Sequence, residues 1–148
     1  MAKKRSGNDS RCCDPSLAPL SWRDYVDLFN PSVISLEKWL GTLASFPRNI
    51  EQGEIDDLME AAEGGMLEDS GDHRTEIKPI RRNPDIFELR RTALSKRLRF
   101  YHGEPKELPR HLVKLHRHIK IDEATQEVEI LFAAERYVGG RDTLWQRD

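Results

Sequence analysis

Hydrophobic positions follow two different spacings along the chain, and the change falls at about residue 77. Before it, apolar residues recur every three or four positions, which is the period of an amphipathic helix. This pattern predicts helices over residues 32–46 and 51–63, ended by Pro47 and by the glycine pair at 64–65. After it, apolar and polar residues alternate, as in strands with one buried face. The expected strands cover residues 77–80, 86–91, 97–102 and 111–119.

A closing helix is expected over residues 122–138, so helices, strands and a last helix follow one another and predict an α+β fold. Residues 21–29 fit either a short helix capped by Ser21 or a first strand. Residues 1–20 are polar and are expected to form a disordered tail. One domain over residues 21–140 and a C-terminal tail over 141–148 complete the expected organisation.

The predicted strands place apolar side chains on one side and basic or aromatic polar side chains on the other. Because side chains alternate along a strand, neighbouring strands should merge the polar ones into one exposed basic face. That face is expected to carry Arg90, Arg97, Arg99, Tyr101, Lys114, His116, His118 and Lys120. The helices should cover the opposite face. The expected core consists of Trp39, Leu40, Leu43, Leu58, Phe87, Leu89, Leu98, Phe100, Val113, Leu115 and Phe132.

Charge is distributed unevenly, although the 148 residues carry a net charge of only −2. Residues 78–120 hold 13 Lys and Arg against 4 Asp and Glu, a net charge of +9, and four of the five histidines. The segments on either side are acidic. A basic middle segment is typical of a surface that binds a polyanion, and a solvated charged face that only keeps the protein soluble is the alternative.

Several classes of protein are not expected. No apolar run reaches the roughly 18 residues of a membrane span, and no secretory signal follows the charged start. The two cysteines, Cys12 and Cys13, are adjacent in the polar tail and are expected to be exposed thiols. Two cysteines are expected to build neither a disulfide framework nor a four-ligand zinc site, so a reducing, cytoplasmic location is expected.

The expected basic face has the groups that RNA cleavage needs without a metal. His116 or His118 has a side chain suited to proton transfer near neutral pH. Arg90 and Arg99 suit bidentate binding of a phosphate, and Lys120 adds positive charge. Tyr101 suits stacking on a base, and Arg97, Lys114 and His118 suit RNA binding. The competing use of the two histidines, metal binding, lacks a third ligand at a recognisable spacing.

Four short motifs resemble the RelE/HigB-like toxin superfamily of bacterial toxin–antitoxin systems, in particular its phage-derived branch. They are Ile86-Phe-Glu-Leu-Arg90, Leu98-Arg-Phe-Tyr101, Leu112-Val-Lys-Leu-His-Arg-His-Ile-Lys120 and Ala133-Ala-Glu-Arg-Tyr137. With the preceding helices, the resemblance covers residues 32–138. His118 stands where the family usually has phenylalanine, and Ile121 where it has a second lysine.

The resemblance implies a RelE/ParE-like fold, a small twisted antiparallel sheet packed by N-terminal helices and a C-terminal helix. It also implies a type II toxin, a ribosome-dependent mRNA endoribonuclease (mRNA interferase) that needs no metal or other cofactor. Arg90, Arg99, His116 and Lys120 match family positions and are its candidate catalytic residues. The implied partners are the ribosome, mRNA and an antitoxin, for example a small helix-turn-helix protein. A non-catalytic binding module of the same fold, acting on a host protein or in a repressor complex, remains the alternative.

Overall fold

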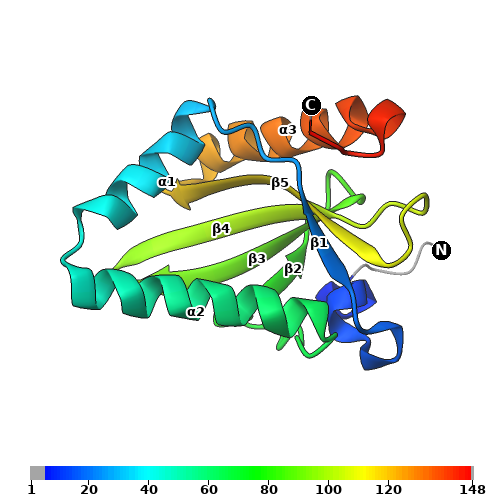
Figure 1. The fold of residues 1–148 in the computed structure, drawn as a ribbon, viewed down its shortest axis with the longest axis horizontal. Coiled ribbons are helices and arrows are strands. Elements are labelled where there is room, and N and C mark those ends of the chain that lie inside the picture. The colour runs from blue at the N-terminus through cyan, green and yellow to red at the C-terminus, as the bar shows by residue number, and fades with distance from the viewer. Residues whose placement is uncertain (1–5, 148) are drawn as a thin grey trace.

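The structure, a computed structural model, describes residues 6–147 and has a five-stranded mixed sheet with three α-helices (Figure 1). The sheet order is β1-β5-β4-β3-β2, with β1 parallel to β5 and the other neighbours antiparallel. The strands are β1 (Ser21–Asp24), β2 (Ile77–Pro79), β3 (Ile86–Ala93), β4 (Lys96–Gly103) and β5 (His111–Lys120). The helices are α1 (Pro31–Thr42), α2 (Ser45–Glu63) and α3 (Glu123–Gly139).

The α+β class and the four predicted strands are confirmed, with strand ends within two residues of those expected. Residues 21–24 form a strand rather than a helix, and their parallel pairing makes the sheet mixed instead of purely antiparallel. Pro47 does not end α1. It lies in the first turn of α2, where a proline costs no intrahelical hydrogen bond because that amide has no partner.

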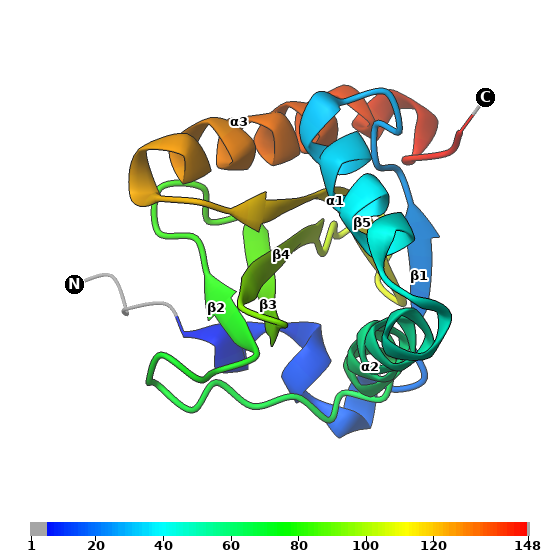
Figure 2. The same ribbon diagram turned by 90° about the vertical axis from the view of Figure 1, so that its left-hand side faces the viewer.

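Helices cover both faces of the sheet, whereas the sequence analysis expected them on one face only. Figure 2 shows α3 on one side and α2 on the other, with α1 beside β5 between them. One hydrophobic core includes Leu36, Leu58, Leu89 and Leu98 on the α1–α2 side. A second core includes Val113, Ala133 and Tyr137 on the α3 side. The face expected to be exposed and basic is therefore largely covered.

An irregularity in β5 divides the residues that strict alternation would keep together. Tyr101 is opposite His116, but the next residue, His102, is opposite Lys114, so Leu115 is an extra residue in β5. Such a β-bulge reverses the alternation of side chains beyond it. Leu115 and His116 consequently both face α3: Leu115 packs in the α3-side core, and His116 lies under the helix. Lys114 points to the other face. The expectation that Lys114 and His116 share a face is wrong for this reason.

Residues 6–20 are ordered, contrary to the expectation of a disordered tail, and residues 1–5 lie outside the described part. Three short 3₁₀ turns follow one another between Gly7 and Leu17. The Arg11 guanidinium donates hydrogen bonds to the carbonyls of Pro105, Leu108 and His111. Cys12 is fully buried rather than exposed. This segment therefore packs on the sheet as part of the domain.

The C-terminal residues up to 147 also belong to the packed structure. Trp145 is fully buried, and its indole nitrogen donates a hydrogen bond of 2.9 Å to the Tyr137 carbonyl. The two rings stack with centroids 5.4 Å apart. Gly140 allows this approach, because a Cβ atom there would lie 2.3 Å from the Trp145 ring. No helix among the described residues is long and apolar enough to cross a membrane.

Leu98→Ala should lower the free energy of unfolding by about 2–5 kcal/mol, because Leu98 is completely buried between β4 and the α1–α2 layer. Ile121→Ala is the matched control, since Ile121 is 72% exposed and its truncation should change stability by less than about 0.5 kcal/mol. Urea unfolding of both variants measures the difference. Equal losses in the two variants would contradict the position assigned to Leu98.

Candidate functional site

Four of the expected site residues meet at one end of the sheet, near the β3–β4 hairpin. Arg90 lies directly opposite Arg99, and Arg97 lies directly opposite Lys120. All four project from the face that carries α3, and together they are called the basic cluster. Arg97 is exposed and Arg90 is partly exposed, whereas Arg99 is buried. The cluster therefore runs from the surface into the edge of the protein interior.

The buried Glu88 carboxylate pairs with two arginines of the basic cluster. One oxygen, Oε1, lies 2.9 Å from Nε of Arg99 and 3.2 Å from Nε of Arg90. The other oxygen, Oε2, accepts a hydrogen bond of 3.3 Å from Gln126 on α3. Burial raises the pKa of the Glu88 carboxyl, although Arg99 and Arg90 act in the opposite direction. The carboxylate thus fixes both guanidinium groups and links them to α3.

Positive charge exceeds negative charge in this cluster. Two arginines share a single carboxylate, and Lys120 forms a 2.5 Å ion pair with the exposed Glu123. Nε and Nη1 of Arg90 and Nε of Arg99 are buried and lack a well-aligned hydrogen-bond acceptor. A short N–O distance without alignment gives Coulomb attraction but leaves the N–H unsatisfied. The pair therefore carries more positive charge than Glu88 neutralises, and a further acceptor would reach the buried N–H groups only after the side chains shift.

A cleft of about 520 Å³ opens onto this pair at the edge of the sheet beyond the end of β2. Its walls come from α2, from the loop that precedes β2, and from β3 and β4. The basic residues that line it are His73, Arg74, Arg90, Arg91 and Arg99. Acidic side chains line it as well, and Glu51 and Glu54 hold Arg91. Arg90 and Arg99 thus line the cleft, although the N–H groups that lack an acceptor are themselves buried.

Tyr101, His116 and His118 form a separate, buried group under α3. Their rings stack at centroid distances of 5.5–6.2 Å, and each side chain is at most 3% exposed. The Tyr101 hydroxyl lies 2.9 Å from Nε2 of His118 and also accepts a hydrogen bond from Gln126. These rings are therefore not available for base stacking or proton transfer while α3 covers them.

A carboxylate from α3 holds His116 in this group. Nε2 of His116 lies 2.5 Å from Oε2 of Glu129, and the Ser32 hydroxyl at the start of α1 donates to the other oxygen of Glu129. His116 neighbours a negative charge, whereas burial lowers the pKa of His118 to about 4. His118 is accordingly neutral at pH 7, and its Nε2 can accept a hydrogen bond from the Tyr101 hydroxyl.

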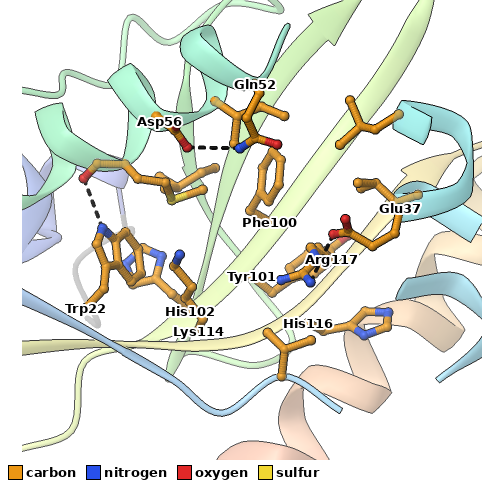
Figure 3. Close-up of a pocket in the computed structure, with 16 residues that line it drawn as sticks. Trp22, Glu37, Gln52, Asp56, Phe100, Tyr101, His102, Lys114, His116 and Arg117 are labelled. Carbon is orange, nitrogen blue, oxygen red and sulfur yellow. Dashed lines mark hydrogen bonds and ion pairs between the residues drawn. The ribbon is translucent and has the colours of Figure 1, made fainter. Parts of the chain in front are cut away.

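Lys114 lies on the α1–α2 face, apart from the basic cluster, in a pocket that Tyr101 and His116 also line. Its ammonium lies 5.4 Å from the centre of the Trp22 ring, and the pocket has a volume of about 270 Å³ (Figure 3). The polar groups there mostly have partners: Arg117 pairs with Glu37, and Gln52 donates to Asp56. Nε of Arg117 and Nδ1 of His102 nevertheless lack a hydrogen-bond partner.

Sequence reasoning did not name Glu88, Gln126 or Glu129 as site residues. Glu88 carried a usable signal, because it alternates with Arg90 and shares its face of β3. Gln126 and Glu129 carried none, since their roles depend on where α3 packs. No known protein family, curated protein or solved structure matches the chain.

Lowering the pH should destabilise the protein partly through His118. The pKa of His118 is about 4 when folded and about 6.5 when unfolded, so protonation between these values favours the unfolded chain. Stability that is present above pH 6.5 should be lost as the pH falls towards 4. His118→Phe keeps an aromatic ring but binds no proton. Between pH 7 and 5, the free energy of unfolding of this variant should fall by up to about 2 kcal/mol less than that of wild type.

Urea unfolding at the two pH values measures this difference. Glu129 opposes the pKa shift of His118, and His116 and Arg99 reinforce it. These three residues are present in both proteins, so the comparison isolates the titration of His118. Equal losses of stability in wild type and His118→Phe would show that His118 does not titrate below its ordinary range.

Proposed function

We propose that the protein binds RNA through its basic cluster and acts as the toxin component of a type II toxin–antitoxin system, as a metal-independent endoribonuclease of the RelE/HigB-like kind. The observation that carries the proposal is the Arg90–Arg99 pair. Both guanidinium groups share one Glu88 oxygen and belong to residues that line an open cleft, and they keep buried N–H groups without a well-aligned acceptor. A phosphodiester supplies the charge and the acceptor oxygens that this pair lacks.

The surrounding charges favour a chain of phosphates over a single anion. Arg97 and Lys120 lie beside the pair on neighbouring strands, and Arg97 reaches the surface at the hairpin end. Several cations in a row can follow successive phosphates, and counterion release then strengthens binding at low salt. The family resemblance of the four strand and helix motifs supports mRNA at the ribosome as the form of RNA.

Cleavage by this route needs two proton transfers. The ribose 2′-hydroxyl loses a proton as its oxygen attacks phosphorus, the bond from phosphorus to the 5′-oxygen breaks, and that oxygen gains a proton. Donors at the phosphate stabilise the added negative charge of the transition state. His116 and His118 are the imidazoles that project from this face of the sheet, so proton transfer by either of them requires α3 to move and expose it. An antitoxin with an acidic segment would suit the same cluster and block it.

The burial of both imidazoles favours one alternative, a non-catalytic binding module on the same fold. In that case the cluster would bind its partner without cutting RNA. The two functions differ in one observable, because only the enzyme leaves new 5′ ends in translated messages when it is expressed in bacteria. Primer extension on such a message therefore separates them.

Arg90→Ala should weaken binding of a single-stranded RNA oligonucleotide and reduce mRNA cleavage in cells by about 10²–10³. The slope of log binding constant against log salt should decrease by about 0.7–1, because one phosphate contact is lost. Arg90 is a better probe than Arg99, because Arg99 is more deeply buried and lies closer to Glu88, so its removal should destabilise the fold more.

Arg110→Ala is the matched control, since Arg110 is an exposed arginine in the β4–β5 connection at the other end of the sheet. It removes the same charge and should leave binding strength, salt slope and cleavage close to wild type. Equal effects of the two substitutions, or no effect of Arg90→Ala in a folded protein, would rule out the cluster as the RNA site.

A further inference from the structure

Three side chains that commonly bind metals converge where the N-terminal turns meet the end of β4. Sγ of Cys12 lies 3.6 Å from Nε2 of His102 and 3.9 Å from Oε2 of Glu104. Nε2 of His102 lies 2.8 Å from the same Glu104 oxygen. Within residues 6–147, this is the one place where three such ligand atoms gather within 4.8 Å. The group lies apart from the basic cluster, towards the opposite end of β4.

The three atoms surround a common point rather than forming a relay. In a Cys–His–carboxylate relay, the thiol and the carboxylate contact different ring nitrogens, so that one orients the imidazole while the other loses its proton. Here both approach Nε2, and Nδ1 of His102 is buried without a hydrogen-bond partner. Nucleophilic catalysis by Cys12 does not fit this arrangement, whereas coordination of one ion does.

The two distances from the Cys12 sulfur are close to those between ligand atoms of a tetrahedral zinc site. Zinc bonds of about 2.3 Å to sulfur and 2.0–2.2 Å to nitrogen or oxygen place tetrahedral ligand atoms about 3.4–3.6 Å apart. The observed 3.6 and 3.9 Å from sulfur are close to this, and only the 2.8 Å between His102 and Glu104 has to lengthen. Thiolate, imidazole and carboxylate together favour zinc over magnesium or calcium, which prefer oxygen alone.

The surrounding contacts hold each ligand in place. The Ser10 hydroxyl donates to Oε2 of Glu104, and the Arg11 amide donates to Oε1 at 2.8 Å. The His102 ring stacks on Phe87 and meets the edge of Trp22, which sets the direction of Nε2. Ligands fixed in this way lose little freedom on binding.

We propose that Cys12, His102 and Glu104 bind one zinc ion, which fastens the N-terminal turns to the end of β4. The Cys12 thiol gives up its proton to solvent when the zinc–sulfur bond forms, and any proton on Nε2 of His102 leaves as well. A water molecule takes the fourth tetrahedral position. Because zinc binds the folded protein and not the unfolded chain, it raises the free energy of unfolding by an amount set by its concentration and dissociation constant.

The test uses the full-length protein, reduced and freed of metal by a chelator, titrated with Co²⁺ and then with Zn²⁺. Co²⁺ should bind one equivalent and give the thiolate-to-cobalt absorption and the intense visible bands of a tetrahedral site. Zn²⁺ should then displace it. Zn²⁺ at a hundredfold excess over its dissociation constant should raise the ratio of folded to unfolded protein about a hundredfold.

Cys12→Ser and Cys13→Ser form a matched pair, because Cys13 is adjacent but contacts the Gly7 carbonyl instead of the cluster. Cys12→Ser should abolish the thiolate band and weaken Zn²⁺ binding by more than about 100-fold, since even changes outside the ligand shell cost 10–100-fold. Cys13→Ser should bind like wild type. Glu104→Gln should weaken binding but keep the thiolate band.

Two results would overturn the proposal without depending on whether a variant folds. One is folded wild-type protein that binds no Co²⁺ or Zn²⁺. The other is wild-type protein that binds Co²⁺ without a thiolate band. Equal Zn²⁺ affinity in wild type and folded Cys12→Ser would overturn it as well.

Discussion

A buried carboxylate between two arginines determines how the α3-side face of the sheet is built. Glu88 on β3 contacts Arg90 on its own strand, Arg99 on β4 and Gln126 on α3, so three elements meet at one side chain. A buried charge is costly unless it is paired, and removing one partner of such a pair commonly costs about 3–5 kcal/mol. Two arginines more than neutralise the charge of Glu88, so an excess of positive charge remains. The same contact therefore holds α3 on the sheet and supplies the charge that the proposed RNA binding uses.

The placement of α3 separates the basic cluster from the two buried imidazoles. The basic cluster lies at the rim of the helix and partly reaches solvent, whereas His116 and His118 lie beneath it, tied to Glu129 and Tyr101. Arg97 is exposed and Arg90 is partly exposed, so a phosphate can approach these two residues without movement of α3, whereas proton transfer by either buried imidazole requires it. If the chain cleaves RNA with His116 or His118, displacement of α3 is the step that controls activity. An antitoxin or the ribosome would act through this helix by favouring one of its positions.

Alternation of apolar and polar residues was sufficient to place β3, β4 and most of β5, because a half-buried strand imposes that period on its sequence. It failed at Leu115, since a bulge inserts one residue and leaves no local signature in composition. It also could not say which face α3 would cover, which is decided by long-range packing. The N-terminal turns escaped prediction for a related reason. Arg11 and Cys12 are ordered by contacts with residues some 90–100 positions away, not by an apolar period.

The central claim is that Arg90 and Arg99 together receive a phosphate of an RNA chain. NMR of the arginine Nε–H groups during titration with a single-stranded RNA oligonucleotide tests it most directly. Signals of Arg90 and Arg99 should shift together with one dissociation constant, while that of Arg141, held by Glu107 at 2.6 Å, stays in place. RNA that saturates the protein without moving the signals of Arg90 and Arg99 would contradict the claim.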